Sequence, residues 1–436
     1  MNVLKFGGTS VGSVERIKNV SRLVLERGRN VVVLSAMSGT TNTLVDICDY
    51  LAKGNRDSAL ETLNTLQTKY DGVVRELFGE GLYHDTAATI MTQILGMIRS
   101  IIAVDYTENY GKEILAQGEL MSTNLFHQYL LSQGVRSVLL PALDFMRINE
   151  DAEPDMRFIT MHLRLLMEQY PDGDIYLTQG YICRNAHGRI DNLRRGGSDY
   201  TASLIGAAIN ADEIQIWTDI DGMHNNDPRY VENTSPVAEL HFDEAAELAY
   251  FGAKILHPSC VLPARLANIP VRLLNTLEPD KPGTLIYNVQ NSGTIKAVAA
   301  KDDVTAIKIK SGRMLVAYGF LHKIFDIFEK HRTSIDMMAT SEVGVSVTID
   351  NTDHLADIVD DLKNFSTVTV DHDMTIICVV GDLDWHNNGL EAKAVSALAG
   401  IPVRMISYGG SNYNISMLVH KSDKVRALRA LSEALF

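Results

Sequence analysis

The sequence predicts an α/β protein: a layered sandwich of helices around a mainly parallel sheet, followed by two small α/β modules. Two observations carry this prediction. Short apolar strands alternate with helical segments from the first residues onward. In the last third of the chain, one order of elements occurs twice at an offset of 68 residues, measured from Ser334 to Pro402.

The first two strand and helix pairs lie within residues 1–52. Residues 3–6 are apolar, Gly7-Gly8 ends this strand, and apolar residues then recur at helical spacing from Val14 to Val24. Residues 30–36 form a continuous apolar run, which is typical of a strand buried on both faces of a parallel sheet, and a second helical pattern follows from Leu44.

The middle of the chain extends this sandwich. Residues 58–134 are mostly helical in period and read as an elaboration on the sheet. Further strands are expected at 137–140, 174–182, 213–218 and 270–274, and helices at 198–210 and 242–251.

The repeat predicts two copies of one small module. In the first copy, a helix at 321–331 leads to a strand at 344–349; in the second, a helix at 390–398 leads to a strand at 414–419. The period is too long for a solenoid unit. We therefore expect two β-α-β-β-α-β modules, each with its helices on one face of an antiparallel sheet, and infer a regulatory role for the pair.

Composition excludes several classes of protein. The 436 residues hold 40 Lys and Arg against 54 Asp and Glu, a net charge of −14, which argues against nucleic-acid or anionic-membrane partners. The four cysteines lie far apart without a paired motif, as in a reducing compartment. The amino terminus lacks a signal-peptide pattern and no apolar run reaches 18 residues, so we expect a cytoplasmic protein.

The first motif, Lys5-Phe-Gly-Gly-Thr-Ser10, suits a phosphate group. Its glycines let backbone N–H groups approach anionic oxygens, the hydroxyl residues stand where we expect a helix to start, and Lys5 adds a full positive charge. A Walker A loop is excluded because there the lysine follows the glycines. The alternative is a plain glycine turn with a solvated lysine.

The second motif, Arg194-Arg-Gly-Gly-Ser-Asp-Tyr-Thr-Ala202, suits a carboxylate. A guanidinium can grip a carboxylate through two hydrogen bonds, and Ser198 or Asp199 is expected to cap the following helix. The motif lacks the second glycine of a serine hydrolase elbow. A glycine loop with solvated arginines is the alternative.

Two further motifs lie downstream. Residues 217–229 place three carboxylates, a histidine and an arginine after a strand, and we interpret them as a nucleotide loop rather than a calcium loop, whose remaining ligands are missing. In Phe251-Gly-Ala-Lys-Ile-Leu-His-Pro258, Lys254 could reach a phosphate or be a surface lysine.

Together with Ser35-Ala-Met-Ser-Gly-Thr-Thr-Asn42 and Gln117-Gly-Glu-Leu-Met-Ser122, these motifs closely resemble, in order, those of the aspartate kinase family. The resemblance covers essentially the whole chain. It implies an amino acid kinase fold for residues 1–292 and ferredoxin-like ACT domains at 300–370 and 371–436, with the terminal strands available to complete the first. Because the sequence ends at Phe436, a single-function enzyme without a homoserine dehydrogenase part is expected.

The resemblance implies transfer of a phosphoryl group from ATP, with Mg²⁺, to L-aspartate, the committed step towards lysine, threonine and methionine. Mg²⁺ would be held by phosphate oxygens and water, not by protein residues. The implied catalytic residues are Lys5, Asp199 and Lys254. The implied ATP-binding residues are Lys5, Gly7, Gly8, Ser10, Thr218, Asp219, His224, Arg229 and Lys254, and the aspartate-binding residues are Ser38, Thr41, Glu119, Arg195 and Ser198.

Some positions depart from the family pattern. Arg194, Cys183 and His224 replace a usual glycine, glycine and tyrosine, and Asn225-Asn226 replaces two threonines, so the nucleotide contacts at 224–226 stay open.

In the regulatory part, the resemblance implies a lysine effector site and pairing of the ACT domains in a homodimer. The implied effector residues are Met314, Phe320, Leu321, Ser334, Asp336, Thr340 and Ser341. Two other functions stay open: an amino acid kinase acting on a different carboxylate, and a non-catalytic amino acid sensor.

Overall fold

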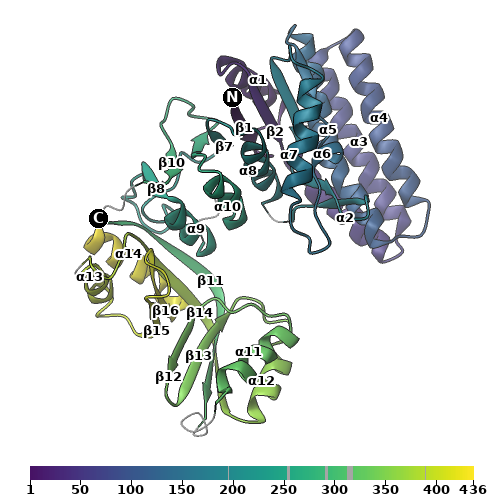
Figure 1. The fold of residues 1–436 in the computed structure, drawn as a ribbon. Coiled ribbons are helices and arrows are strands. Elements are labelled where there is room, and N and C mark those ends of the chain that lie inside the picture. Colours follow the sequence, from purple (N-terminus) through teal and green to yellow (C-terminus); the bar gives the residue numbers. More distant parts are fainter. Residues whose placement is uncertain (195, 253–255, 290–292, 312–317, 388) are drawn as a thin grey trace. The chain divides into compact units, whose positions relative to one another are not determined.

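The computed structural model describes residues 1–194, 196–252, 256–289, 293–311, 318–387 and 389–436. The chain forms two compact units (Figure 1). The first unit consists of Met1–Met223 and Ile255–Asn288, and the second of His224–Lys254 and Val289–Phe436. The second unit therefore includes a segment that precedes the last part of the first unit in the sequence. The predicted domain boundary at residue 292 stays a prediction.

The first unit is built on a mainly parallel sheet whose strands lie in the order β3-β4-β2-β1-β7-β9-β10. Only β10 in this series runs antiparallel to its neighbour. The strands of this unit are β1 (Asn2–Phe6), β2 (Asn30–Leu34), β3 (Ser137–Leu139), β4 (Ile175–Gln179), β7 (Ile214–Thr218), β9 (Val271–Asn275) and β10 (Thr284–Tyr287), with a separate hairpin of β5 (Ile182–Arg184) and β6 (Ile190–Asn192). Each predicted strand is confirmed within a few residues. The two strands β2 and β4 are buried along their whole length, as expected for strands covered on both faces.

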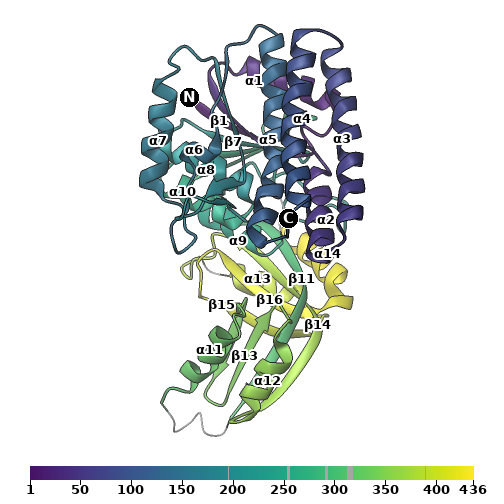
Figure 2. The ribbon, with the colours of Figure 1, turned by 90° about the vertical axis from the view of Figure 1, so that its right-hand side faces the viewer.

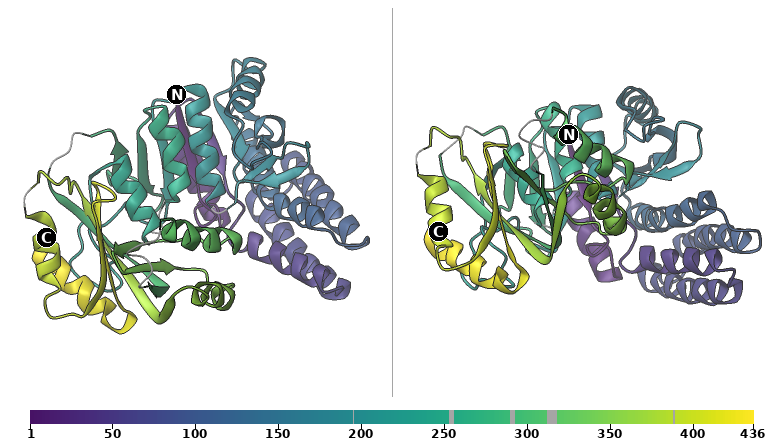
Figure 3. Two further views of the ribbon diagram at one scale, coloured as in Figure 1. Left: turned by 60° about the horizontal axis from the view of Figure 1, so that its bottom comes forward. Right: turned by 90° about the horizontal axis from the view of Figure 1, so that it is seen from below.

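Helices surround this sheet and extend beyond it. They are α1 (Val14–Glu26), α2 (Thr40–Ala52), α3 (Arg56–Phe78), α4 (Leu82–Ile102), α5 (Glu108–Ser132), α6 (Ala142–Phe145), α7 (Met156–Glu168), α8 (Gly197–Ile209) and α10 (Pro258–Leu266). The helices α2 to α5 pack against one another, and Figure 3 shows the longer ones side by side next to the sheet. This bundle confirms the helical elaboration expected at 58–134.

The second unit contains an antiparallel sheet in the order β12-β13-β11-β14-β16-β15. Its strands are β11 (Ile295–Lys310), β12 (Met338–Ser341), β13 (Gly344–Ile349), β14 (Thr367–Gly381), β15 (Val403–Tyr408) and β16 (Asn414–His420), and a further short strand is β8 (Glu239–His241). The two long strands β11 and β14 pass through both repeats. Residues 304–310 of β11 pair with β13 and the first part of β14, whereas residues 295–301 pair with the second part of β14. The two modules therefore share one sheet instead of forming two.

The helices of the second unit cover this sheet (Figure 2). They are α9 (Phe242–Tyr250), α11 (Phe320–Lys330), α12 (Leu355–Lys363), α13 (Leu390–Ala397), the 3₁₀ turn η2 (Lys421–Asp423) and α14 (Lys424–Leu435). The pair α11 and α12 builds one apolar core with β11 and β13, and the pair α13 and α14 builds another with β14 and β16. The helix α9 also packs on β11 and β14, which explains why residues 374–381 of β14 are buried without alternation.

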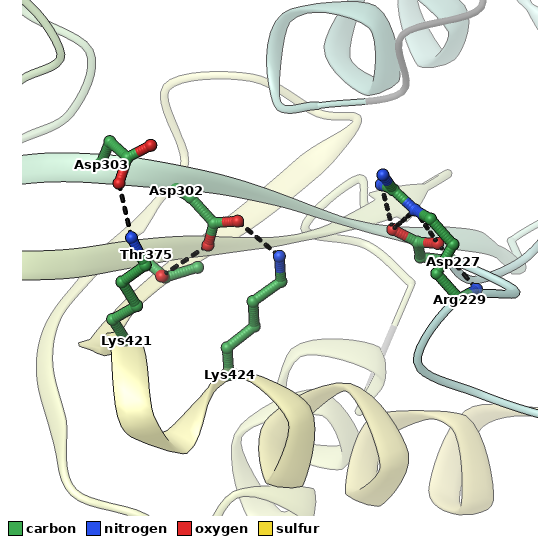
Figure 4. A network of polar contacts seen from close by, with 7 residues as sticks. All are labelled: Asp227, Arg229, Asp302, Asp303, Thr375, Lys421 and Lys424. Atoms are coloured by element: carbon green, nitrogen blue, oxygen red, sulfur yellow. Dashed lines mark hydrogen bonds and ion pairs between the residues drawn. The ribbon is translucent and has the colours of Figure 1, made fainter.

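A bulge in β11 marks the place where the two modules meet. The register slips between Lys301 and Val304, and Asp303 has a left-handed φ of 59°. The neighbouring Asp302 accepts hydrogen bonds from the Lys424 ammonium at 2.5 Å and from the Thr375 hydroxyl at 2.9 Å (Figure 4). These contacts join the bulge to the start of α14 and to β14. Among the described residues, no helix is both long and apolar enough to cross a bilayer.

Candidate active site

A cleft of about 720 Å³ lies at the carboxyl ends of β1, β2 and β4 in the first unit. This is the edge at which open α/β sheets bind ligands. The cleft is lined by Lys5, Gly8, Thr9, Ser35, Ala36, Met37, Ser38, Gly39, Thr41, Asn42, Glu119, Tyr181, Asn192, Arg194, Gly196, Gly197, Ser198 and Asp199. Six residues that the sequence predicts to bind substrate or phosphate are thus brought together with Asp199.

Lys5 is the fixed cation of this cleft. It lies near the end of β1, and its Nζ is 2.5 Å from Oδ1 of Asp199 in the first turn of α8. Only 12% of the lysine side chain and 14% of the aspartate side chain are exposed. Because both charges are largely removed from water, the pair holds the ammonium in one position instead of letting it sample solvent.

The glycine turn after β1 fits closely against the next turn of the sheet. A Cβ on Gly8 would lie 2.7 Å from the carbonyl oxygen of Ala36, so only glycine allows this approach. The Ser38 N–H donates to the Gly8 carbonyl at 3.1 Å. The expectation that the hydroxyl residues of this motif start the helix is wrong, because α1 begins at Val14 and Ser13 is its N-cap. The Ser10 hydroxyl lies 3.4 Å from the Thr276 hydroxyl and is buried.

Two helices begin at the cleft. Thr41 lies in the first turn of α2 after its N-cap Gly39, and Ser198 lies in the first turn of α8 after its N-cap Gly196. Both N-cap glycines have left-handed φ values, and neither helix has a side-chain cap. The expectation that Ser198 or Asp199 caps α8 is therefore wrong. The first N–H of each helix donates to a backbone carbonyl, Thr40 to Met37 at 3.0 Å and Gly197 to Arg194 at 3.1 Å. No side chain caps the N–H groups that follow, so these can face an anion, and Asp199 pairs with Lys5 instead.

Glu119 is the buried acid of the cleft. It lies within α5, is 5% exposed, and its Oε1 accepts a hydrogen bond from the Ala36 N–H at 3.2 Å. Burial raises the pKa of Glu119 to about 7, against a smaller opposite effect of the backbone hydrogen bond. A Cβ on the preceding Gly118 would lie 2.9 Å from the Ala36 side chain, so this glycine lets α5 approach the loop after β2. A carboxylate that lines a cleft in this way is suited to an ammonium group.

The remaining nucleotide-binding candidates lie elsewhere. Thr218 is the last residue of β7 in the first unit and Asp219 follows it, and the Thr218 hydroxyl donates to Asp219 Oδ1 at 3.1 Å. His224 and Arg229 belong to the second unit. There the Nδ1 of His224 is 2.9 Å from the Thr234 hydroxyl, and the Arg229 guanidinium holds Asp227 through two nitrogens (Figure 4).

Three predicted site residues, Arg195, Lys254 and Met314, lie outside the described residues. Of the other effector candidates, Phe320 belongs to the core under α11, whereas Leu321, Ser334, Thr340 and Ser341 are exposed. The Asp336 side chain is 1% exposed.

The sequence interpretation missed several residues of the cleft. Tyr181 and Asn192 line it from the segment after β4 and from β6. The rule that ligands bind beyond strand ends could have identified Tyr181, because it follows β4 by two residues. Lys69 of α3 donates to the Ser38 carbonyl at 2.8 Å, and only the folded bundle brings it there. Arg194, which replaces a usual glycine of the family pattern, also lines the cleft.

Two family models match the chain. The amino acid kinase family model matches residues 1–275, and an ACT domain model matches residues 377–435.

Known proteins match it over its full length. Lysine-sensitive aspartokinase 3 of Escherichia coli is 32% identical, with 100% of this chain and 99% of that protein covered, and chloroplastic aspartokinase 1 of Arabidopsis thaliana is 33% identical, with 100% and 80% covered. The crystal structure of E. coli aspartokinase III with aspartate and ADP, in the R-state, has a TM-score of 0.86 over 100% of both chains. The structure of the same enzyme with lysine and aspartate, in the T-state, has a TM-score of 0.83 over 100% of this chain and 99% of the other. The chain belongs to the amino acid kinase family, as an aspartokinase with ACT domains.

Proposed function

We propose that this chain is an aspartate kinase that transfers the γ-phosphoryl group of ATP to the side-chain carboxylate of L-aspartate and is inhibited by lysine. The products are ADP and 4-phospho-L-aspartate, in the committed step towards lysine, threonine and methionine. One observation carries the proposal: the Lys5 ammonium, held by Asp199, lines a cleft at which α2 and α8 begin. The two helix N-termini add partial positive charge there, in a chain of net charge −14. Full-length similarity to E. coli aspartokinase III supports the choice of substrate.

The chemistry needs no general base. The attacking carboxylate is ionised near neutral pH, so it can form the new O–P bond while the bond between the γ-phosphorus and the ADP oxygen breaks. The protein has to align two anions and balance the charge on the transferred group. The Lys5 ammonium and the N–H groups at the starts of α2 and α8 that no side chain caps can do this. Lys254 is proposed as the second cation.

The substrate is proposed to lie between Glu119 and the helix starts. The Glu119 carboxylate would bind the aspartate ammonium, and Arg195 its α-carboxylate. Ser38, Thr41 and Ser198 would complete the aspartate pocket. The nucleotide would contact Gly7, Gly8 and Ser10, together with Thr218, Asp219, His224 and Arg229.

Mg²⁺ is proposed to enter with ATP, where it neutralises phosphate charge. Among the described residues, the two carboxylates that line the cleft already have partners, since Asp199 pairs with Lys5 and Glu119 accepts from Ala36. This fits a metal held by phosphate oxygens and water, as hard Mg²⁺ is often bound.

The second unit is proposed to bind lysine and to pair in a homodimer through its ACT modules. The R-state and T-state structures of E. coli aspartokinase III, the latter with lysine, support inhibition through two conformations. Asp336 would bind an ammonium group of the effector.

A coupled assay of ADP release tests the proposal. Aspartate and glutamate are compared as substrates, and lysine, threonine and methionine as inhibitors. We expect ADP release that depends on aspartate and is suppressed by lysine. Preference for glutamate would identify another amino acid kinase activity, and ATP binding without turnover would identify a sensor; either result contradicts the proposal.

A further inference from the structure

The two oxygens of the buried Asp336 carboxylate differ in their hydrogen bonding. Its Oδ1 accepts from the Lys301 ammonium at 2.8 Å and from the Tyr250 hydroxyl at 3.0 Å. Its Oδ2 is buried and has no hydrogen-bond partner among the residues that the structure describes. Burial raises the pKa of Asp336, whereas the hydrogen bond and charge of Lys301 lower it. A carboxylate oxygen buried in a side chain that is 1% exposed usually has a donor or a cation as its partner, and this one lacks it.

The charges around Asp336 also favour a bound cation. Lys301 also contacts Asp350 at 2.9 Å, so one ammonium is shared by two carboxylates. Lys301 further lies 4.7 Å from the centre of the Tyr250 ring, in a cation–π arrangement. With both acids ionised the cluster is one positive charge short, and a ligand ammonium at Asp336 Oδ2 supplies that charge.

Tyr250 connects this cluster to a segment with a different predicted role. It is the last residue of α9, and the predicted catalytic Lys254 follows four residues later in the sequence. The backbone at Gly252 packs closely against the Ala300 carbonyl oxygen. Gly252 has a φ of +119°, and a Cβ on it would lie 2.2 Å from that oxygen. Ala300 directly precedes Lys301 in β11. The end of α9 is thus held by Asp336 on one side and by the β11 backbone on the other.

The backbone of Asp336 is bonded to a neighbouring strand. Its N–H donates to the Thr348 carbonyl at 2.9 Å, which ties the residue to β13. A change in the hydrogen bonding of the carboxylate can therefore be accommodated more easily at the Tyr250 hydroxyl than at the Asp336 backbone.

We propose that Tyr250 is a positioning residue that transmits the binding of a ligand ammonium at Asp336 to the end of α9. This inference rests on the proposed inhibition by lysine. A ligand ammonium at Oδ2 draws the carboxylate and Lys301 into a new arrangement and changes the bond that Tyr250 donates. The end of α9 and the chain up to Gly252 then shift with the ring. In this proposal Tyr250 has no contact with the substrate or with the reacting atoms.

The test separates binding of lysine from its effect. Tyr250→Phe removes only the hydroxyl, and Tyr250 is 42% exposed, so the variant is expected to fold. Lysine binding is measured by calorimetry on the full chain, and kcat/KM for ATP is measured without lysine and at saturating lysine. We expect a lysine Kd within about threefold of the wild-type value, while the loss of kcat/KM caused by saturating lysine shrinks about fivefold or more.

Tyr408→Phe is the matched control. The Tyr408 hydroxyl donates to the Leu383 carbonyl at 3.1 Å in the same unit, so this variant loses one tyrosine hydrogen bond without affecting Asp336. Its inhibition should equal that of the wild type.

Two results would overturn the proposal. One is full inhibition of Tyr250→Phe at saturating lysine, even if more lysine is needed, because Tyr250 would then only shape the pocket. The other is equal weakening of inhibition in the Tyr408 variant. A wild-type enzyme that phosphorylates aspartate but does not respond to lysine instead contradicts the inhibition on which the proposal rests.

Discussion

The ammonium of Lys5 lies 2.5 Å from Asp199 Oδ1, which joins the end of the first strand to the first turn of α8. Each partner comes from a glycine-containing motif, and the two motifs are almost 200 residues apart in the sequence. The pair fixes a positive charge where the helix N-termini of α2 and α8 also lie.

Lys5→Ala should abolish most turnover while the chain still folds, at reduced stability because the largely buried Asp199 carboxylate loses its partner. Loss of a charge placed for the transferred phosphoryl group is expected to lower kcat by about 100-fold or more. Steady-state kinetics and circular dichroism measure the two effects. Lys18→Ala is the control, because Lys18 is an exposed lysine of α1. Wild-type kcat in Lys5→Ala would refute the assigned role.

Glu119 should make aspartate binding depend on pH. Burial raises the pKa of Glu119 to about 7, so its charge is lost as the pH falls below that value, and the KM for aspartate should rise. Glu119→Gln should raise this KM by about 10-fold to 100-fold at pH 8 and remove the pH dependence between pH 6 and 8. A wild-type KM profile in the variant would contradict the role.

The same residue makes a prediction about stability. The pKa of Glu119 is raised on folding, so ionisation is harder in the folded than in the unfolded chain. The wild type therefore loses stability relative to Glu119→Gln as the pH rises from about 4.5 to about 7. Thermal unfolding at pH 5 and pH 8 tests this: the advantage of the variant should be larger at pH 8, and a larger advantage at pH 5 would show that the sign is wrong.

Gly8→Ala should damage the cleft, because its Cβ would lie 2.7 Å from a backbone oxygen. We expect a loss of stability of about 1–3 kcal/mol from overpacking, together with a loss of activity. Gly72→Ala is a matched control inside α3, where a Cβ meets no atom within 4 Å. That variant should be stabilised by about 0.5–1 kcal/mol. Similar melting temperatures for both variants would argue against the close approach of the two turns.

Lys424→Met should destabilise the second unit. The Lys424 side chain is 9% exposed and holds Asp302 at the β11 bulge, so its loss leaves a partly buried carboxylate with only the Thr375 hydroxyl. We expect a cost of about 2 kcal/mol, seen as a lower midpoint of thermal unfolding. Lys421→Met removes the neighbouring but exposed pair with Asp303 and should change the midpoint little. Equal effects of the two variants would contradict this account.

The sequence predicted the elements better than their assembly. Apolar periodicity located β2, α8 and β13, since a buried face or strand leaves a local pattern. The capping of α8 was wrong because it depends on the left-handed φ of Gly196, which residue types alone do not specify. The packing of α9 on β14 places residues 224–254 in the second unit, and no local pattern reports such a long-range contact.

In the candidate site, too, residues in local motifs were predicted and residues that depend on long-range contacts were not. Lys5, Glu119 and Ser198 were predicted from motifs and line one cleft. Lys69 and Tyr250 were not, because a single lysine or tyrosine at a helix position has no signal until the fold supplies its partner.

Trapping of the product with hydroxylamine tests the central claim most directly. Hydroxylamine converts an acyl phosphate to a hydroxamate, so it distinguishes phosphorylation of a carboxylate from simple hydrolysis of ATP. With ATP, Mg²⁺ and L-aspartate, the wild type should form aspartyl hydroxamate in a one-to-one ratio with ADP, and Lys5→Ala should form almost none. Release of ADP without hydroxamate, or undiminished hydroxamate from Lys5→Ala, would contradict the account.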